Sequence, residues 1–108
     1  MYEQIDRIPF KGKVLDFGGG EKADYANKIK KRITSGVYQS INISKSIKPT
    51  YLIKPSGKIP LDPETIDIIF SANTLEHIYD LEKTLKDFYR VLKKKGTCFI
   101  LVPFIYRV

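Results

Sequence analysis

A glycine-rich turn is the first feature of the sequence that could do chemistry. Asp16 and Phe17 close an apolar run and are followed directly by Gly18, Gly19 and Gly20. Backbone without side chains can turn sharply and approach a ligand closely, which a Cβ would hinder. A helix that follows such a turn also offers its first N–H groups. Three glycines in a row are equally able to form an ordinary tight turn between a strand and a helix.

Two common phosphate-binding motifs do not match this turn. A P-loop is excluded, because no Gly-Lys-Ser or Gly-Lys-Thr follows at the required spacing. The dinucleotide fingerprint G-x-G-x-x-G is incomplete, since Ala23 stands at the third glycine position, although alanine is accepted there. Glu21 would meet a pyrophosphate with like charge, whereas it suits a cationic sulfonium. A dinucleotide-binding domain is therefore kept only as the least favoured alternative.

The elements that position the turn alternate along the chain. Strands are predicted over 13–17, 37–43, 51–53, 66–71 and 97–102, and helices over 23–33 and 80–95. Strands joined by helical crossovers pair in parallel, and right-handed crossovers place helices on both faces. We therefore predict an α/β fold with a mostly parallel sheet of about five strands. Ligands of such sheets bind beyond the carboxyl ends of the strands, where the glycine turn lies.

The helix predicted over 80–95 has the clearest periodicity in the chain. Asp80 is its expected N-cap and Gly96 the expected residue just after its last turn. The apolar stripe predicted to face the sheet consists of Leu81, Leu85, Phe88, Tyr89 and Leu92.

Four segments in this order resemble motifs of the class I S-adenosylmethionine-dependent methyltransferases, type 11 subgroup. Residues 14–21 (VLDFGGGE) resemble motif I, and residues 58–69 (KIPLDPETIDII) resemble its LPF-x-x-x-x-FD-x-V segment. Residues 73–78 (NTLEHI) are similar to its LEH-[IV] segment, and 89–96 (YRVLKKKG) to its RVLKPGG turn. The resemblance implies a Rossmann-like sheet with helices on both faces and S-adenosylmethionine as the cofactor.

The resemblance also implies which residues bind that cofactor. The positions that match are Asp16, Gly18, Gly19, Gly20, Asn42, Asn73 and Leu75. Asn42 stands where the family usually has an acidic residue that accepts hydrogen bonds from the ribose hydroxyls. An amide offers only one acceptor oxygen and no charge, so acceptance from both hydroxyls is lost.

No catalytic residue follows from the sequence. The sulfonium is an activated leaving group, so holding the acceptor in line provides much of the acceleration, and a base is needed only when the acceptor must lose a proton early. His77 is the only histidine, and with no Cys or His partner it predicts no metal site. The single Cys98 lies in an apolar run and is expected to be a core residue.

Composition limits the remaining classes. No apolar run is long enough to span a bilayer, and the first residues do not form a signal peptide. A single cysteine suits a reducing compartment. We therefore expect a cytoplasmic protein. The net charge is +7, yet its lysines cluster where helices need solvated faces and basic last turns. Nucleic-acid binding is thus neither required nor excluded.

The length of 108 residues predicts a single domain over 1–108, which lacks the last strands of the seven-stranded methyltransferase core and could be a fragment of a longer protein. Two functions follow from the resemblance: methyl transfer to an unidentified acceptor, or a non-catalytic, truncated binding module that needs a partner or a missing segment. The strand over 97–102 is expected to be a bare sheet edge, so we expect self-association or a partner chain there.

Overall fold

The computed structural model describes residues 3–101 except 24, 34, 56 and 73–79. The elements follow one another as η1 (Glu3–Arg7), β1 (Gly12–Phe17), α1 (Ala26–Arg32), β2 (Gly36–Asn42), η2 (Lys45–Ile47), β3 (Tyr51–Leu52), β4 (Ile66–Ala72), α2 (Leu81–Val91) and β5 (Leu92–Leu101).

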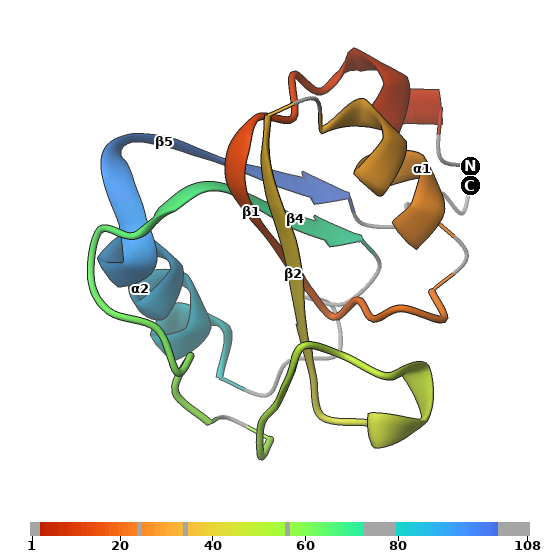
Figure 1. The fold of residues 1–108 in the computed structure, drawn as a ribbon. Coiled ribbons are helices and arrows are strands. Elements are labelled where there is room, and N and C mark those ends of the chain that lie inside the picture. The colour runs from red at the N-terminus through yellow and green to blue at the C-terminus, as the bar shows by residue number, and fades with distance from the viewer. Residues whose placement is uncertain (1–2, 24, 34, 56, 73–79, 102–108) are drawn as a thin grey trace, which may run out of the picture.

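The strands form one sheet in the order β3-β2-β1-β4-β5, with every neighbouring pair parallel (Figure 1). The predicted α/β fold with a five-stranded parallel sheet is therefore confirmed. The chain moves from β1 toward one edge through β2 and β3, and then crosses back to β4 and β5 on the other side of β1. This reversal makes the carboxyl end of β1 the topological switch point of the sheet.

Helices cover both faces of the sheet, and each face has its own apolar core. On one face, η1 and α1 contribute Ile5 and Ile29 to a cluster with Val14 and Phe70 of the strands. On the opposite face lies a second cluster, formed by Leu15, Phe17, Ile41, Ile59, Ile66, Ile69, Phe88 and Val91. Successive side chains of a strand point to opposite faces, so consecutive apolar residues in β1 and β4 serve both clusters.

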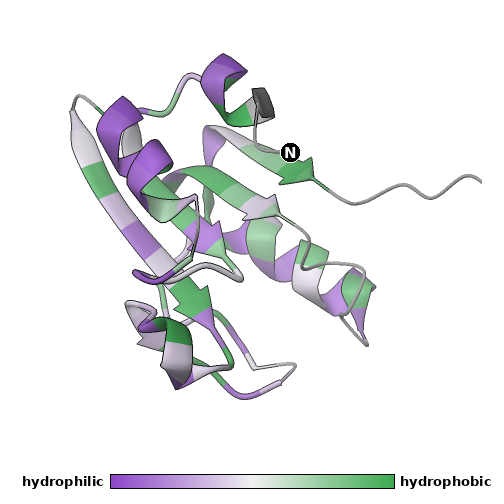
Figure 2. Cartoon of the chain, turned by 90° about the vertical axis from the view of Figure 1, so that its right-hand side faces the viewer, coloured by the Kyte–Doolittle hydropathy of each residue, from purple (hydrophilic) through white to green (hydrophobic). Residues whose placement is uncertain are grey.

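The hydropathy of the elements matches this layered arrangement. The central strands are mostly hydrophobic, whereas α1 presents many hydrophilic residues (Figure 2). β4 is buried along nearly its whole length, as its β-branched run predicts for a strand covered on both faces. Among the described residues, no helix is long and apolar enough to cross a membrane.

The predicted end of the second helix is wrong. α2 begins after Asp80, whose carboxylate accepts a hydrogen bond from the backbone N–H of Lys83 (3.1 Å), as predicted for an N-cap. The helix stops at Val91 rather than continuing to 95, and Gly96 lies within β5 instead of capping it. The helix ends here because of backbone pairing with a distant segment. The N–H of Thr65 donates to the carbonyl of Val91 (2.9 Å), which would otherwise have no hydrogen-bond partner at the end of the helix.

The predicted apolar stripe of α2 is only partly correct. Phe88 and Val91 are buried against the sheet, but Leu81 and Leu85 are exposed and Tyr89 is 85% exposed. The buried side of the helix therefore runs through Phe88 and Val91, and the exposed leucines and tyrosine lie on another side.

Other boundaries also differ from the prediction, and β5 begins at Leu92 rather than at 97. α1 begins at Ala26 rather than 23, because the chain first makes turns in which the N–H of Ala23 donates to the carbonyl of Gly20 (3.0 Å). β5 pairs with β4 through Ile66 and Leu92 and then, after a bulge in the register, from Ile68 and Thr97 onward. β5 occupies an edge of the sheet, as predicted, although residue 102 of the predicted strand lies outside the described residues.

Candidate functional site

The glycine turn lies at the switch point of the sheet. It follows β1 directly, and the N–H of Gly18 donates to the carbonyl of Ile41 near the end of β2 (2.7 Å). The carboxyl ends of β1 and β2 are thereby joined at the edge where parallel sheets bind their ligands.

Each glycine of the turn is required for a different reason. Gly18 has a φ of 95°, a conformation that residues with a Cβ rarely adopt. A Cβ on Gly19 would collide with the carboxylate of Asp16, and a Cβ on Gly20 would collide with the backbone carbonyl of Ile47. The chain itself therefore fills the space that the glycines leave at Gly19 and Gly20. A close approach of a ligand to the turn stays a prediction.

Asp16 lies beneath the turn and is fully buried. The hydroxyl of Tyr38 donates to its Oδ2 (2.6 Å) and the hydroxyl of Tyr25 to its Oδ1 (3.2 Å). Burial raises the pKa of Asp16 to about 7, although the two tyrosine hydrogen bonds lower it. Burial and the neighbouring Asp16 also raise the pKa of Tyr38. Asp16 thus braces the glycine turn from below, and its carboxylate is enclosed by protein rather than exposed.

Asn42 holds the turn from the side. Its Nδ2 donates to the carbonyl of Gly18 (2.8 Å) and more weakly to that of Gly19 (3.4 Å), while its Oδ1 accepts from the N–H of Ser44 (3.0 Å). The amide orientation is required, because only the amino group can donate to the two carbonyls. A carboxylate at this position would face these oxygens without a proton to share. The side chain is therefore engaged with the protein backbone.

The segment after β2 closes over the start of the turn toward α1. The N–H groups of Glu21 and Lys22 donate to the carbonyls of Lys48 and Ile47, each at 3.0 Å. These two amides are therefore bound by the chain itself. The side chain of Glu21 is exposed next to the glycines.

Exposed apolar side chains lie at the neighbouring strand ends. Ile43, directly after β2, is 59% exposed, and Leu52, at the end of β3, is 56% exposed. Leu52 pairs in register with Asn42, so these residues stand at the same edge as the glycine turn. A large apolar side chain that is exposed beside a backbone turn suits contact with a flat organic group.

Some predicted site residues fall outside the described part of the chain. Asn73 and Leu75, expected near the methionine moiety, and His77 all lie in the segment 73–79. Within the described residues, no group of three or more His, Cys, Asp or Glu side chains could hold a metal ion. Cys98 is half-buried, and burial raises the pKa of its thiol to about 11, so it is not an activated nucleophile.

Sequence reasoning missed the two tyrosines and Ile47. The sheet register contains a signal for one of them, since Tyr38 pairs with Val14 and Ser40 pairs with Asp16. Residues two apart on a strand share a face, so Tyr38 lies on the same side as Asp16. Ile47 contacts the turn through its backbone carbonyl, which no side-chain pattern reveals.

Comparison with known families and structures gives a consistent result. The profile of a family described as a methyltransferase domain matches residues 15–100, which includes the glycine turn, β4 and α2. Among curated proteins, no sequence matches the chain significantly.

Several solved structures share the fold. A protein of Methanococcus maripaludis described as an S-adenosyl-L-methionine-dependent methyltransferase superimposes with a TM-score of 0.74 at 19% identity, over 90% of this chain and 51% of that one. A methyltransferase of Haloferax volcanii, solved in complex with the activator Trm112, superimposes with a TM-score of 0.68 at 21% identity. The superposition covers 87% of this chain and 47% of that one. An Aquifex aeolicus methyltransferase superimposes with a TM-score of 0.66 at 25% identity, over 84% of this chain and 57% of that one. The chain thus spans about half the length of the structures that it matches.

Proposed function

The chain belongs to this family of methyltransferase domains, and from that premise we propose that it binds S-adenosylmethionine at the glycine turn for methyl transfer to an acceptor. The observation that carries the proposal is the turn itself, a side-chain-free backbone at the switch point of a parallel sheet. We further propose that Asp16, Gly18, Gly19, Gly20, Asn42, Asn73 and Leu75 form or support the cofactor site.

The residues at this edge fit the cofactor. Ile43 and Leu52 offer exposed apolar surface for the adenine ring, and Glu21 offers an exposed carboxylate near a cationic sulfonium. Asp16 and Asn42 differ from the other proposed site residues, because their polar atoms form hydrogen bonds with groups of the protein itself. We assign them the role of holding the turn in shape.

When bound, the cofactor supplies a sulfonium-activated methyl group. The contribution of the chain is then to hold the cofactor at the sheet edge and to fix the turn through Asn42 and Asp16, so that an acceptor meets the methyl group in line. No described residue is assigned the role of a general base.

Calorimetric titration with S-adenosylhomocysteine, and separately with NAD, tests the proposal. We expect binding of the first and none of the second; binding of NAD alone would replace the proposal with the dinucleotide alternative. Gly18→Val should abolish binding, because valine cannot adopt a φ of 95° at that turn without strain. Unchanged affinity in that variant would contradict a cofactor site at the turn.

A charge variant separates loss of the site from loss of the fold. Glu21→Arg changes an exposed side chain and should weaken S-adenosylmethionine, a cation, by about fivefold more than neutral S-adenosylhomocysteine. Glu82→Arg makes the same exchange at another exposed position, on α2, and is the matched control, which should affect neither ligand. Equal effects of Glu21→Arg on both ligands would place the sulfonium elsewhere.

A second candidate is a module that binds the cofactor but does not transfer methyl groups alone. The chain spans about half of each matched structure, so methyl transfer by these residues alone is the activity that separates the two candidates. Binding of S-adenosylhomocysteine without methyl transfer to any fraction of a cell extract would support this candidate over the enzyme.

The edge strand β5 is the proposed contact for another chain. It pairs only with β4 among the described strands, and Ile100 is exposed. Unpaired edges are templates for strand addition. We propose self-association or a partner chain there, and a related structure contains an activator partner. Sedimentation should show association that Ile100→Lys weakens; a wild-type monomer at all concentrations would contradict self-association.

A further inference from the structure

We propose that a cavity between α2 and the segment 57–59 binds a small phosphorylated molecule with an apolar, ring-sized body. The cavity has a volume of about 410 Å³, within the range of ligand pockets. Its described lining consists of Phe17, Gly57, Lys58, Ile59, Lys83, Thr84, Lys86, Asp87 and Arg90. The proposal does not depend on cofactor binding at the glycine turn.

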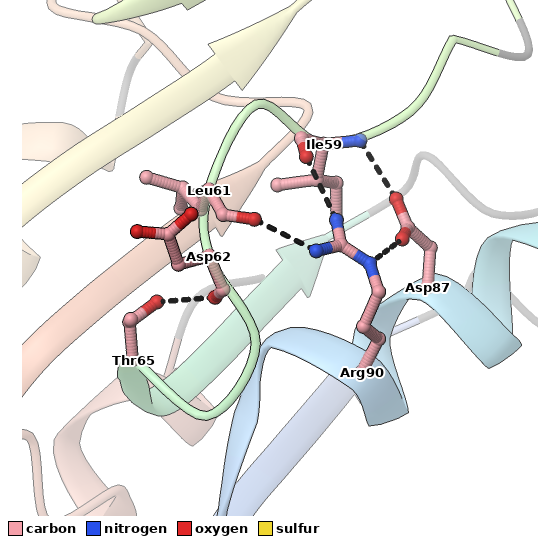
Figure 3. A network of polar contacts seen from close by, with 6 residues as sticks. All are labelled: Ile59, Leu61, Asp62, Thr65, Asp87 and Arg90. Atoms are coloured by element: carbon pink, nitrogen blue, oxygen red, sulfur yellow. Dashed lines mark hydrogen bonds and ion pairs between the residues drawn. The ribbon is translucent and has the colours of Figure 1, made fainter.

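The walls of the cavity are fastened to each other by a polar network (Figure 3). Arg90 of α2 donates to the carbonyls of Ile59 and Leu61, each at 2.8 Å. Asp87 accepts from the backbone N–H of Ile59 (2.7 Å) and from Nε of Arg90 (2.6 Å). The segment and the helix are thus held at a fixed separation, so the cavity is present before any ligand arrives, which favours binding.

The charge that remains in the cavity is positive. Asp87 is the only acidic residue of the described lining, and its carboxylate is neutralised by Arg90 in a largely buried ion pair. Lys58 and Lys83 are exposed and make no ion pair with any described residue. Within the described part of the chain, Lys86 pairs with Glu82 alone, at 3.4 Å and with both side chains highly exposed, and such a contact contributes little.

The chemistry of the lining indicates the class of ligand. Several lysine ammonium groups around one opening suit a multiply charged anion, and lysine is a common phosphate ligand. Phe17 and Ile59 make the inner surface apolar, and the aliphatic stems of the lysines extend it. A phosphate attached to a ring-sized apolar body matches both parts, whereas inorganic phosphate would use only the lysines.

The position of the cavity connects it with the candidate site. Phe17 is the last residue of β1 and directly precedes Gly18. A ligand that contacts Phe17 would therefore lie against the strand that carries the glycine turn. The cavity also distinguishes the proposed small molecule from nucleic acid, whose phosphates would engage basic side chains over a broad surface rather than around a single pocket.

Titration of the nitrogen-15-labelled chain with phenyl phosphate, inorganic phosphate and a single-stranded RNA oligomer tests the proposal by amide chemical shifts. We expect phenyl phosphate to shift the amides of 57–59 and 83–87, and to bind at least about tenfold more tightly than inorganic phosphate, because only its ring contacts the apolar floor. Absence of these shifts would overturn the proposal. RNA binding without a phenyl phosphate site would do the same.

Two variants test the assignment to this cavity. Lys58→Glu with Lys83→Glu should lower the affinity for phenyl phosphate at least about tenfold. Lys31→Glu with Lys94→Glu makes the same change of net charge on exposed residues outside the lining and should change the affinity less than about twofold. If both double variants lost the same affinity for phenyl phosphate, the ligand would be attracted by the net charge of the chain rather than by this cavity, and the site would be refuted.

A steric variant keeps the charge constant. Thr84 is half-buried in the lining, and Thr84→Phe should fill the cavity and abolish phenyl phosphate binding while thermal unfolding shows a folded chain. Retained binding in a folded Thr84→Phe chain would contradict the proposal. Parallel titration with S-adenosylhomocysteine reports separately on the glycine turn, so failure at one site does not obscure the other.

Discussion

Replacement of Asn42 by Asp removes one amino group from the glycine turn and tests how this turn is held. The Nδ2 of Asn42 donates to the carbonyl of Gly18 at 2.8 Å and to that of Gly19 at 3.4 Å. In Asn42→Asp an oxygen takes the place of this donor and faces both carbonyl oxygens. The bond from the N–H of Ser44 to Oδ1 is retained, so the change is confined to one side of the side chain.

The size of the effect follows from these contacts. Loss of the short hydrogen bond costs about 1 kcal/mol, and leaving a half-buried carbonyl against a carboxylate costs about 1 to 2 kcal/mol more. We therefore expect the free energy of unfolding to fall by about 2 to 3 kcal/mol, which lowers the melting temperature by about 10 °C in a chain of this size. Because the turn is displaced, the affinity for S-adenosylhomocysteine should fall as well, by about tenfold.

Urea unfolding followed by circular dichroism, together with calorimetric titration, measures both quantities. Gln39→Glu is a matched control on the same strand, because it also converts an amide to an acid. The Nε2 of Gln39 donates to the hydroxyl of Tyr51 (3.1 Å), and that hydroxyl can rotate and donate to a carboxylate instead. This control should therefore lose much less stability.

The opposite result would refute the reasoning. If Asn42 were free to bind a ribose, Asn42→Asp would supply a second acceptor and a charge, and the affinity for the cofactor would rise at unchanged stability. A protonated carboxyl can donate to a carbonyl, so the stability deficit should also shrink as the pH falls. A deficit that does not depend on pH would argue against the proposed contact with Gly18 and Gly19.

Three further predictions test the same region and the network beneath α2. Gly20→Ala should lower the free energy of unfolding by about 2 kcal/mol or more, measured in urea, because its Cβ collides with a backbone carbonyl of Ile47; an unchanged value would contradict that close contact. The folded-state pKa of Asp16 is raised to about 7, so the native chain holds a proton that the unfolded chain has lost, and stability should decline by up to roughly 4 kcal/mol as the pH rises from about 4 to 7. Asp16→Asn should flatten this decline in urea unfolding measured at both ends of the range, and an equally steep decline would exclude Asp16 as its source. Arg90→Lys should lower the thermal stability by about 2 kcal/mol, because an ammonium cannot replace the guanidinium bonds to two carbonyls and Asp87; a smaller loss than in Lys94→Ala would show that the network is dispensable.

The fold was largely predictable because its strands are short apolar runs between strong turn signals. The β-branched run after Thr65 became β4, and the run before Gly18 became β1, each within a residue or so of the predicted bounds. Parallel pairing followed from the alternation of strands and helices, since an intervening helix leaves little other choice. The profile match and the similar structures then confirmed the family that the motifs had indicated.

The ends and orientation of α2 were not predictable from its own sequence. The apolar periodicity predicted that the helix continues past Val91 and that Tyr89 lies on its buried side. In the structure the helix ends at Val91 and Tyr89 is exposed. The backbone N–H groups of Glu64 and Thr65, which are distant in sequence, donate to the carbonyls of Arg90 and Val91 at the end of the helix. Contacts between segments that are far apart along the chain compete with local propensity, and a local pattern contains no information about them.

The sequence by itself determined where the glycine turn lies and that it follows a buried parallel strand, because these depend on residue types and on near neighbours. Only the tertiary structure decided what the polar residues around the turn do. Asp16 is enclosed by Tyr25 and Tyr38, and Asn42 is bound to glycine carbonyls, each through partners separated from it in the chain. The direction of a side chain and the identity of its hydrogen-bond partner are set by packing, which exists only once the sheet is assembled.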